Sequence, residues 1–132
     1  MEQSPKVWTI GHSNRTITEF ISLLKTVNIQ IVIDVRSKPR SRFYWFNSAK
    51  LTEYLAEAGI VYEHQPSIGG FIKGDDYTEV LDSIATRAQN GKRLALMCSE
   101  GKPEQCHRGT ELTPEFQRRN IKVEHLLYDR TL

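Results

Sequence analysis

Short apolar runs rich in β-branched residues alternate along the chain with longer segments in which apolar residues recur every three or four positions. The short runs lie at residues 7–10, 29–35, 60–62, 93–97 and 123–127, and such runs are typical of buried strands. The periodic segments lie between them, at about residues 16–27, 48–58, 77–88 and 106–119, and their periodicity indicates amphipathic helices. The pattern therefore predicts a regular alternation of strand and helix.

This alternation predicts parallel strand pairing, because two consecutive parallel strands need a long crossover connection, which is usually a helix. We expect a single three-layer α/β domain over residues 1–132, with a mostly parallel sheet of about five strands and helices on both faces. In such sheets the functional site lies beyond the carboxyl ends of the strands. The loops that follow residues 10, 35 and 97 are therefore the first places to look for chemistry.

Composition places the chain among ordinary globular proteins. Hydrophobic residues make up 39% of the chain and charged residues 26%. The sequence does not begin with a basic and then apolar leader, and no stretch approaches the roughly 18 apolar residues that span a bilayer. We therefore expect a cytoplasmic protein without a membrane partner. The net charge of +2 does not by itself indicate nucleic-acid binding, and the sequence indicates no oligomeric state.

The segment MCSEGKPEQCHRG (97–109) follows a predicted strand and leads into a predicted helix. It contains both cysteines of the chain, Cys98 and Cys106. Backbone N–H groups and the dipole at a helix start stabilise a thiolate or a bound anion, and they lower a cysteine pKa from about 8.5 toward neutrality. The pattern predicts Cys98 as a nucleophile, with His107 or His12 as its base and Cys106 as a resolving thiol or second anion ligand.

Two other interpretations of the cysteines stay open. Cysteine is among the most buried residue types, and a cysteine that ends a strand is commonly part of the core. Thiolates and imidazoles are also preferred zinc ligands, although seven residues separate the two cysteines where zinc motifs usually have two to four. In a reducing compartment we expect both cysteines to be thiols unless catalysis or a metal pairs them. We expect neither a metal nor another cofactor.

A basic and then aromatic segment forms the second unusual feature. Arg36, Lys38, Arg40 and Arg42 come two residues apart and are followed directly by four aromatic residues, 43–46, with no acidic residue between 35 and 52. Arginine holds phosphates or carboxylates through two hydrogen bonds, and exposed aromatic rings stack on bases. The segment suits a nucleotide or single-stranded nucleic acid. The alternative is a solvated basic loop whose aromatic rings pack into the core.

Two strand ends and one loop contain further residues that could belong to a functional site. Asp34 ends an apolar strand, where a carboxylate is costly unless it is paired or hydrogen-bonded, so we expect it to orient its neighbours. The turn GHSNR (11–15) suits either an anion held by backbone donors and Arg15 or a polar turn that caps a helix. The glycine pair at 69–70 marks a loop, and His64 and His125 are expected to be structural.

These considerations give two groups of candidate site residues. The candidate catalytic residues are Cys98, Cys106, His107, His12, Glu100 and Asp34. The candidate substrate-binding residues are Arg36, Arg40, Arg42, Arg108, Ser13, Asn14, Arg15, Ser37, Ser99, Gly69, Gly70 and Tyr44.

Four ordered segments together resemble one family. They are TIGHSNRT (9–16), DVRSKPRSRF (34–43), the loop at 69–70 and MCSEGKPEQCHR (97–108), and the family is the uncharacterised one called domain of unknown function four-eight-eight. This resemblance implies no settled reaction. A fainter similarity is to rhodanese-like sulfurtransferases, which place Asp-Val-Arg at a strand end and a catalytic cysteine at the start of a phosphate-cradle-like loop. That similarity implies Cys98 as the catalytic cysteine.

Two functional hypotheses follow. The first is a cysteine-dependent enzyme, a thiol-dependent transferase or hydrolase that acts on an anionic small molecule, a nucleotide or a modified nucleobase, with Cys98 as nucleophile or sulfur carrier. The alternative is a nucleic-acid-binding domain that uses the basic aromatic segment 36–46 and has structural cysteines. A third reading is a metal-supported binding module.

Overall fold

The computed structural model describes residues 4–36, 38–39, 41–69, 76–99 and 111–128. Its strands are β1 (Lys6–Gly11), β2 (Ile31–Asp34), β3 (Val61–His64), β4 (Leu94–Cys98) and β5 (Lys122–His125). Its helices are α1 (Ile17–Thr26), α2 (Ser48–Glu57), α3 (Asp76–Gln89) and α4 (Thr113–Arg118), with two short 3-10 turns, η1 (Tyr44–Phe46) and η2 (Pro66–Ile68). Among the described residues, one α-helix lies between each pair of consecutive strands, as the hydrophobic pattern predicts.

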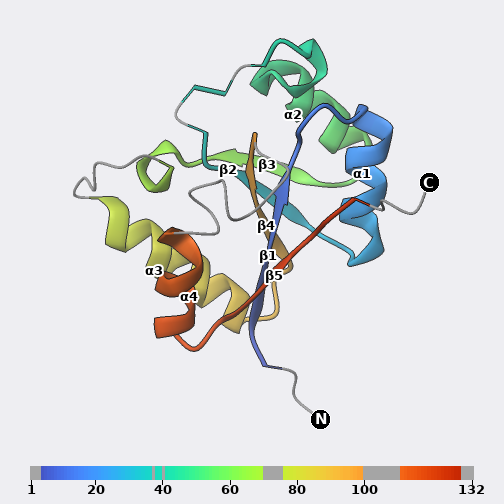
Figure 1. The fold of residues 1–132 in the computed structure, drawn as a ribbon. Helices are drawn as coiled ribbons and strands as arrows, with labels where there is room; N and C mark the ends of the chain where they lie inside the picture. The colour runs from blue at the N-terminus through green and yellow to red at the C-terminus, as the bar shows by residue number, and fades with distance from the viewer. Residues whose placement is uncertain (1–3, 37, 40, 70–75, 100–110, 129–132) are drawn as a thin grey trace.

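The five strands form one parallel sheet in the order β3-β2-β4-β1-β5. Strand β4 lies in the centre, between β2 and β1, although it is the fourth strand along the chain. Because all pairs are parallel, the carboxyl ends of the strands lie along one edge of the sheet, and β1 and β4 run upward toward it in Figure 1. This edge carries the loops in which the sequence predicts the chemistry.

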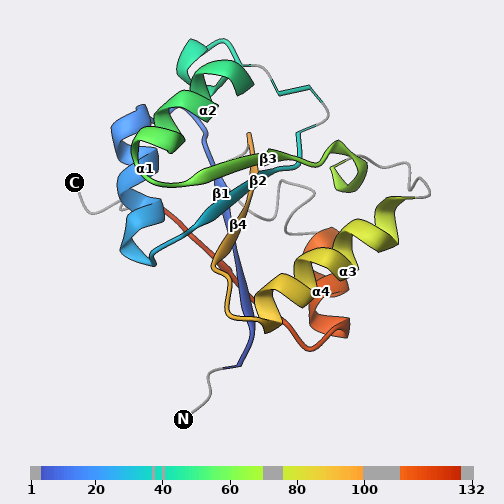
Figure 2. The ribbon, with the colours of Figure 1, turned by 180° about the vertical axis from the view of Figure 1, so that it is seen from behind.

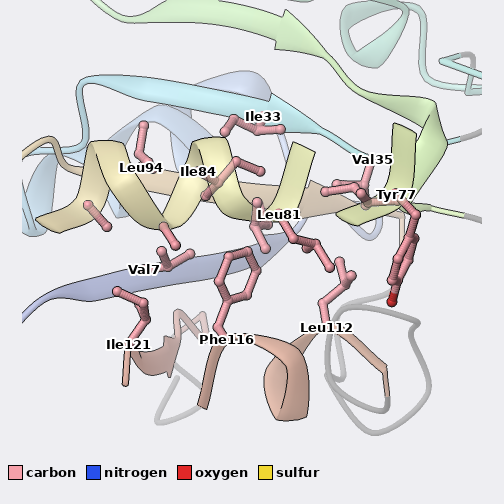
Figure 3. Packing of buried hydrophobic residues seen from close by; sticks show 14 of the residues in the cluster. Val7, Ile33, Val35, Tyr77, Leu81, Ile84, Leu94, Leu112, Phe116 and Ile121 are labelled. Carbon is pink, nitrogen blue, oxygen red and sulfur yellow. The ribbon is translucent and has the colours of Figure 1, made fainter. Parts of the chain in front are cut away.

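Two hydrophobic cores cover the two faces of the sheet. Helices α1 and α2 pack on one face, around Phe20, Leu24 and Leu55, and helices α3 and α4 pack on the other (Figures 1 and 2). Figure 3 shows the second core, in which Leu81 of α3 and Phe116 of α4 lie over the strands. The predicted fold class, a three-layer α/β domain with helices on both faces, is therefore confirmed.

The local sequence determines where helix α1 begins. The side chain of Thr16 accepts a hydrogen bond from Glu19 N at 3.1 Å, and Thr16 N donates to the Glu19 carboxylate at 2.9 Å. This reciprocal capping box satisfies two backbone donors that a helix start otherwise leaves without partners. It also holds the loop after β1 against the start of the helix.

Several boundaries differ from the predicted ones by a few residues. Strand β3 extends to His64, so that histidine lies in the strand instead of after it. The N-cap of α2 is Asn47, one residue before the predicted Ser48. The predicted start of the last helix, at residue 106, lies outside the described residues, and α4 is described from Thr113. None of the helices in the described part of the chain has the length and apolar character of a membrane span.

Candidate functional site

The ends of β1, β2 and β4 are joined by backbone hydrogen bonds at the carboxyl edge of the sheet. Gly11 lies in register with Cys98, and His12 N donates to Cys98 O at 3.0 Å. On the other side of β4, Val35 N donates to Met97 O at 3.0 Å. The sequence predicts chemistry at three strand ends, and the sheet places these ends side by side.

A buried ion pair joins Asp34 and Arg36 at this edge. Arg36 Nε donates to Asp34 Oδ1 at 2.9 Å, and Arg36 Nη2 donates to Oδ2 at 2.8 Å. The exposed fractions of the two side chains are 0% for Asp34 and 5% for Arg36. Arg36 N also donates to Asp34 Oδ1 at 3.0 Å. The sequence predicts that Asp34 must be paired or hydrogen-bonded, and this is confirmed.

Further partners complete the surroundings of this ion pair. The hydroxyl of Tyr62 donates to Asp34 Oδ2 at 2.5 Å, and Arg36 Nη2 donates to the backbone oxygen of Phe46 at 2.7 Å. Burial raises the pKa of Tyr62, and its hydrogen bond to the Asp34 carboxylate acts in the same direction. Three of the five guanidinium N–H groups of Arg36 are therefore occupied by oxygen acceptors of the protein itself.

His12 lies against this network as a neutral base. Its Nδ1 donates to Ser13 O at 2.8 Å, because a carbonyl oxygen can only accept, and its Nε2 then faces Arg36 Nη1 at 3.5 Å. The ring stacks on Phe46 at 4.3 Å between centroids. Burial lowers the pKa of His12 to about 4, and the nearby Arg36 charge lowers it as well. His12 thus carries no charge at neutral pH, and both of its ring nitrogens face protein groups.

Two residues of the next loop hold the chain after β2 in place. His64 Nε2 donates to Arg36 O at 2.7 Å, which agrees with the predicted structural role of this histidine. Gly69 follows η2 and lies directly against the backbone of Val35. A Cβ built on Gly69 would lie 1.4 Å from Val35 O, so only glycine fits this contact. Gly69 is therefore a packing residue of the edge.

Cys98 ends the central strand, and its side chain is buried. It is 6% exposed and belongs to the core on the α3 and α4 face. His12 lies on the other face of the sheet: its ring stacks on Phe46, a residue of the core on the α1 and α2 face. Asp34 is in register with Met97, which also belongs to the core on the α1 and α2 face. Cys98 is also disulfide-bonded. The sequence predicts a thiol here unless catalysis or a metal pairs the cysteines, and in the structure Cys98 is paired.

The loop after β1 is organised around Arg15. Its guanidinium lies over the ring of Tyr128, 4.6 Å from the centroid, and its Nη1 lies 3.4 Å from the Glu19 carboxylate. Trp45 Nε1 donates to Arg15 O at 3.0 Å. Ser13 has a φ of 49°, which belongs to the left-handed region and makes the turn tight. The exposed Asn14 lies at the surface of this turn.

The basic aromatic segment divides into a packed part and an exposed part. Phe46 is fully buried, and Phe43 and Trp45 pack against the same core. Tyr44 is 58% exposed. Arg42 is exposed and lies 5.0 Å from the ring centroid of Phe43. One aromatic ring and one arginine of this described stretch therefore face solvent, and the other aromatic residues serve the core.

Other predicted site residues are placed at the surface or fall outside the described chain. Ser99 follows β4, is exposed, and accepts a hydrogen bond from Ser13 N at 2.8 Å through its backbone oxygen. The predicted residues outside the described residues are Ser37, Arg40, Gly70, Glu100, Cys106, His107 and Arg108. Among the residues that are described, no group of three metal-ligating side chains converges.

One protein family matches part of the chain. Residues 16–74, from the capping box of α1 to just before α3, match the family described as Domain of unknown function DUF488. This segment makes up 59 of the 132 residues, and the match supports the resemblance to that family. The DUF488 segment includes Asp34, Arg36, Tyr62 and Gly69, so most of the buried network lies within it. No curated protein and no solved structure matches the chain. The rhodanese-like similarity stays a prediction.

Sequence reasoning missed three members of the network: Tyr62, the backbone oxygen of Phe46 and the Arg36 contact of His64. A signal for Tyr62 exists, because Val32 is in register with Tyr62 and Asp34 with His64. Neighbouring strand positions two apart face the same side of a sheet. Once β2 and β3 are paired, Tyr62 is therefore placed on the face of Asp34.

Proposed function

We propose that this protein is a cysteine-dependent enzyme that acts on an anionic small molecule or nucleotide, with Cys98 in its reduced form as the reacting group. The observation that carries the proposal is the disulfide bond of Cys98 at the carboxyl end of the central strand. A disulfide forms through attack by a thiolate on another sulfur atom. The sulfur of Cys98 is therefore able to react with a partner although its side chain is largely buried.

The reaction begins with the disulfide being reduced by a dithiol, which supplies two electrons and two protons and becomes a disulfide itself. The Cys98 thiol then gives its proton to solvent, and the thiolate attacks the electrophilic atom of the substrate. A bond from sulfur to that atom forms, the bond to the leaving group breaks, and the leaving group departs with the electron pair. Transfer to water or to a second acceptor releases Cys98.

The buried network supports this role by fixing the strand ends next to Cys98. His12 is a positioning residue in this proposal, because its ring nitrogens face Ser13 O and Arg36 and burial keeps it neutral. Its backbone N–H donates to Cys98 O at 3.0 Å. Asp34 and Arg36 hold the neighbouring strand end in the same way. Anion binding is assigned to cationic side chains at the surface, of which Arg42 is exposed.

Alkylation of the reduced protein tests the proposal. A Cys106→Ser variant leaves Cys98 as the single cysteine, and its rate of reaction with iodoacetamide is measured from pH 5 to pH 9, with the modified residue located by mass spectrometry. We expect the thiol to titrate clearly below its ordinary pKa of about 8.5, and inorganic phosphate to slow the reaction. The Cys98→Ser variant, which keeps Cys106, reports the background. A titration at 8.5 or above contradicts the proposal.

A second candidate function is the binding of single-stranded nucleic acid. The exposed Tyr44 ring and the neighbouring exposed Arg42 favour it, because base stacking and phosphate contacts need these two groups at a surface. An electrophoretic shift with a single-stranded oligonucleotide at low salt tests this candidate. The expected result is a shift that a Tyr44→Ala, Arg42→Ala double variant loses, and the absence of a shift from the unaltered protein removes the candidate.

A further inference from the structure

A hollow of ≈ 560 Å³ lies at the opposite edge of the sheet, where the parallel strands begin. Its wall consists of residues from the start of β1, the end of α3, the turn before β4 and the start of β5: Ser4, Pro5, Lys6, Trp8, Ala88, Gln89, Gly91, Lys92, Arg93 and Lys122. In Figure 1, β1 begins low in the picture, below the strand labels. The volume is within the range of small-molecule pockets.

The lining of this hollow is strongly cationic. Lys6, Lys92, Arg93 and Lys122 belong to it, and no aspartate or glutamate does. Lys6 lies in register with Lys122 on the neighbouring strand, an arrangement that brings like charges together and is unfavourable without a counter-charge. Lys6 has an exposed carboxylate partner, Glu124, at 3.0 Å. Within the described residues, the other three cations have no carboxylate at ion-pair distance.

Arg93 is held so that part of its guanidinium stays available. Its Nε donates to Val27 O at 2.7 Å, and its backbone N donates to Gln30 Oε1 at 2.9 Å. Its guanidinium carbon lies 4.5 Å from the ring centroid of Trp8. Within the described chain, Nη1 and Nη2 have no hydrogen-bond acceptor. These two nitrogens form the fork through which arginine binds phosphate or carboxylate oxygens.

Trp8 gives the hollow an aromatic wall. Its side chain is 5% exposed, and both Lys6 Nζ and the Arg93 guanidinium lie over its ring, at 5.4 Å and 4.5 Å from the centroid. The ring therefore holds two cations of the lining near each other. An oxyanion in the hollow would neutralise these charges.

The end of α3 does not oppose an anion here, although a helix carboxyl end carries negative partial charge. The carbonyl oxygens of Thr86, Arg87 and Ala88 accept hydrogen bonds from the backbone N–H groups of residues 90, 92 and 91. These bonds satisfy three of the four carbonyl groups that the helix end leaves open. The positive side chains therefore dominate the hollow.

We propose that this hollow is a binding site for a small phosphate-bearing anion, separate from the Cys98 edge. Arg93 binds phosphate oxygens through its two free nitrogens, and Lys92 and Lys122 add positive charge to the same lining. The rings and alkyl chains at the wall leave space for a ligand of up to about nucleotide size. The proposal does not depend on the reactivity of Cys98.

Titration calorimetry with inorganic tripolyphosphate at low ionic strength tests this site. We expect one saturable binding event, weakened about ten-fold by the double substitution Lys92→Gln, Lys122→Gln. Both lysines are exposed, and thermal unfolding confirms that the variant is folded. The matched control is Lys50→Gln, which removes an exposed charge in α2. No saturable binding, or equal weakening by the control, overturns the proposal.

The two tryptophans of the chain, Trp8 and Trp45, supply a local readout. Each gives one indole N–H signal in a nitrogen-15 correlation spectrum, and a Trp45→Phe variant assigns them. We expect tripolyphosphate to shift the Trp8 signal and leave the Trp45 signal in place. A shift confined to Trp45 would place the anion at the other edge and overturn the proposal. An oligonucleotide that binds here while tripolyphosphate does not would overturn the small-molecule assignment.

Discussion

Arg36 closes on Asp34 from two directions, with its guanidinium on both carboxylate oxygens and its backbone N–H on one of them. The two residues are separated in sequence by Val35 alone, so the chain bends back on itself directly after β2. Tyr62 reaches the same carboxylate from β3. This ion pair fixes the direction in which the basic segment leaves the sheet.

Removal of the Asp34 charge is expected to destabilise the fold severely. The Asp34→Asn variant keeps the size of the side chain but leaves the Arg36 charge buried without a counter-charge, which costs about 3–5 kcal/mol of unfolding free energy. Equilibrium denaturation in urea measures this loss. The matched control is Glu53→Gln, since Glu53 pairs with Lys50 at 3.5 Å on the exposed surface of α2. Similar losses for the two variants would refute the buried role of Asp34.

Two glycines are expected to resist substitution for different reasons: Gly69 because a side chain would clash, and Gly59 because its backbone has a positive φ. Gly69→Ala places a Cβ 1.4 Å from Val35 O, and we expect a loss of about 3 kcal/mol or more because backbone must move. Gly59 has a φ of +79° and nothing within 4 Å of a built Cβ, so Gly59→Ala is expected to cost about 1 kcal/mol through backbone strain alone. Urea denaturation of both variants measures the contrast, and equal losses would contradict the close contact at Gly69.

The neutral state of His12 predicts a loss of stability in mild acid. Its pKa falls from 6.5 to about 4 in the folded protein, so between these values the unfolded chain takes up a proton that the folded chain does not. The contribution of His12 is fully present above pH 6.5 and is lost as the pH falls through 4, for a total of about 3 kcal/mol. Denaturation from pH 7 to pH 4 measures it.

The control for His12 is the variant His12→Gln, which has no ionisable group at this position. The difference in unfolding free energy between the unaltered protein and this variant isolates the histidine from the carboxylates that titrate lower. We expect that difference to shrink as the pH falls from 6.5 to 4. A difference that stays constant across this range would show that His12 is not held neutral by the fold.

Tyr62 is expected to contribute through its hydroxyl group. Tyr62→Phe removes the hydrogen bond to the Asp34 carboxylate and keeps the ring, with an expected loss of about 2 kcal/mol, since bonds to charged acceptors are stronger than neutral ones. Thermal or urea unfolding measures it. Tyr44→Phe, at a side chain that is 58% exposed, is the matched control and should change stability little. If the control loses as much, the bond to Asp34 is not the cause.

The hydrophobic pattern was sufficient to predict the number, type and parallel pairing of the elements, because the strands are short apolar runs and the segments between them carry apolar residues every three or four positions. The order of the strands did not follow from it. Nothing in the composition of β4 distinguishes a central strand from one next to the centre, and its position between β2 and β1 depends on how the helices share the two faces.

The candidate site was predicted in part. The paired state of Asp34 follows from the cost of a carboxylate at the end of an apolar strand, and the structure confirms it. That Arg36 is the partner could not be derived, because an arginine after a strand suits a ligand as well as an internal carboxylate. The face on which Cys98 points depends on strand register, which sequence alone leaves undetermined to within one residue.

The central position of β4 has a consequence for the order in which the chain can fold. Strands β1 and β2 pair with β4 on its two sides and not with each other, so the first 93 residues cannot form a continuous sheet. Until residues 94–98 pair between them, the β2–β3 pair and β1 stay separate, and their apolar faces are incompletely covered. Closure over so long a separation in sequence is slow. We therefore expect the two halves of the sheet to join in a late, cooperative step that depends on β4.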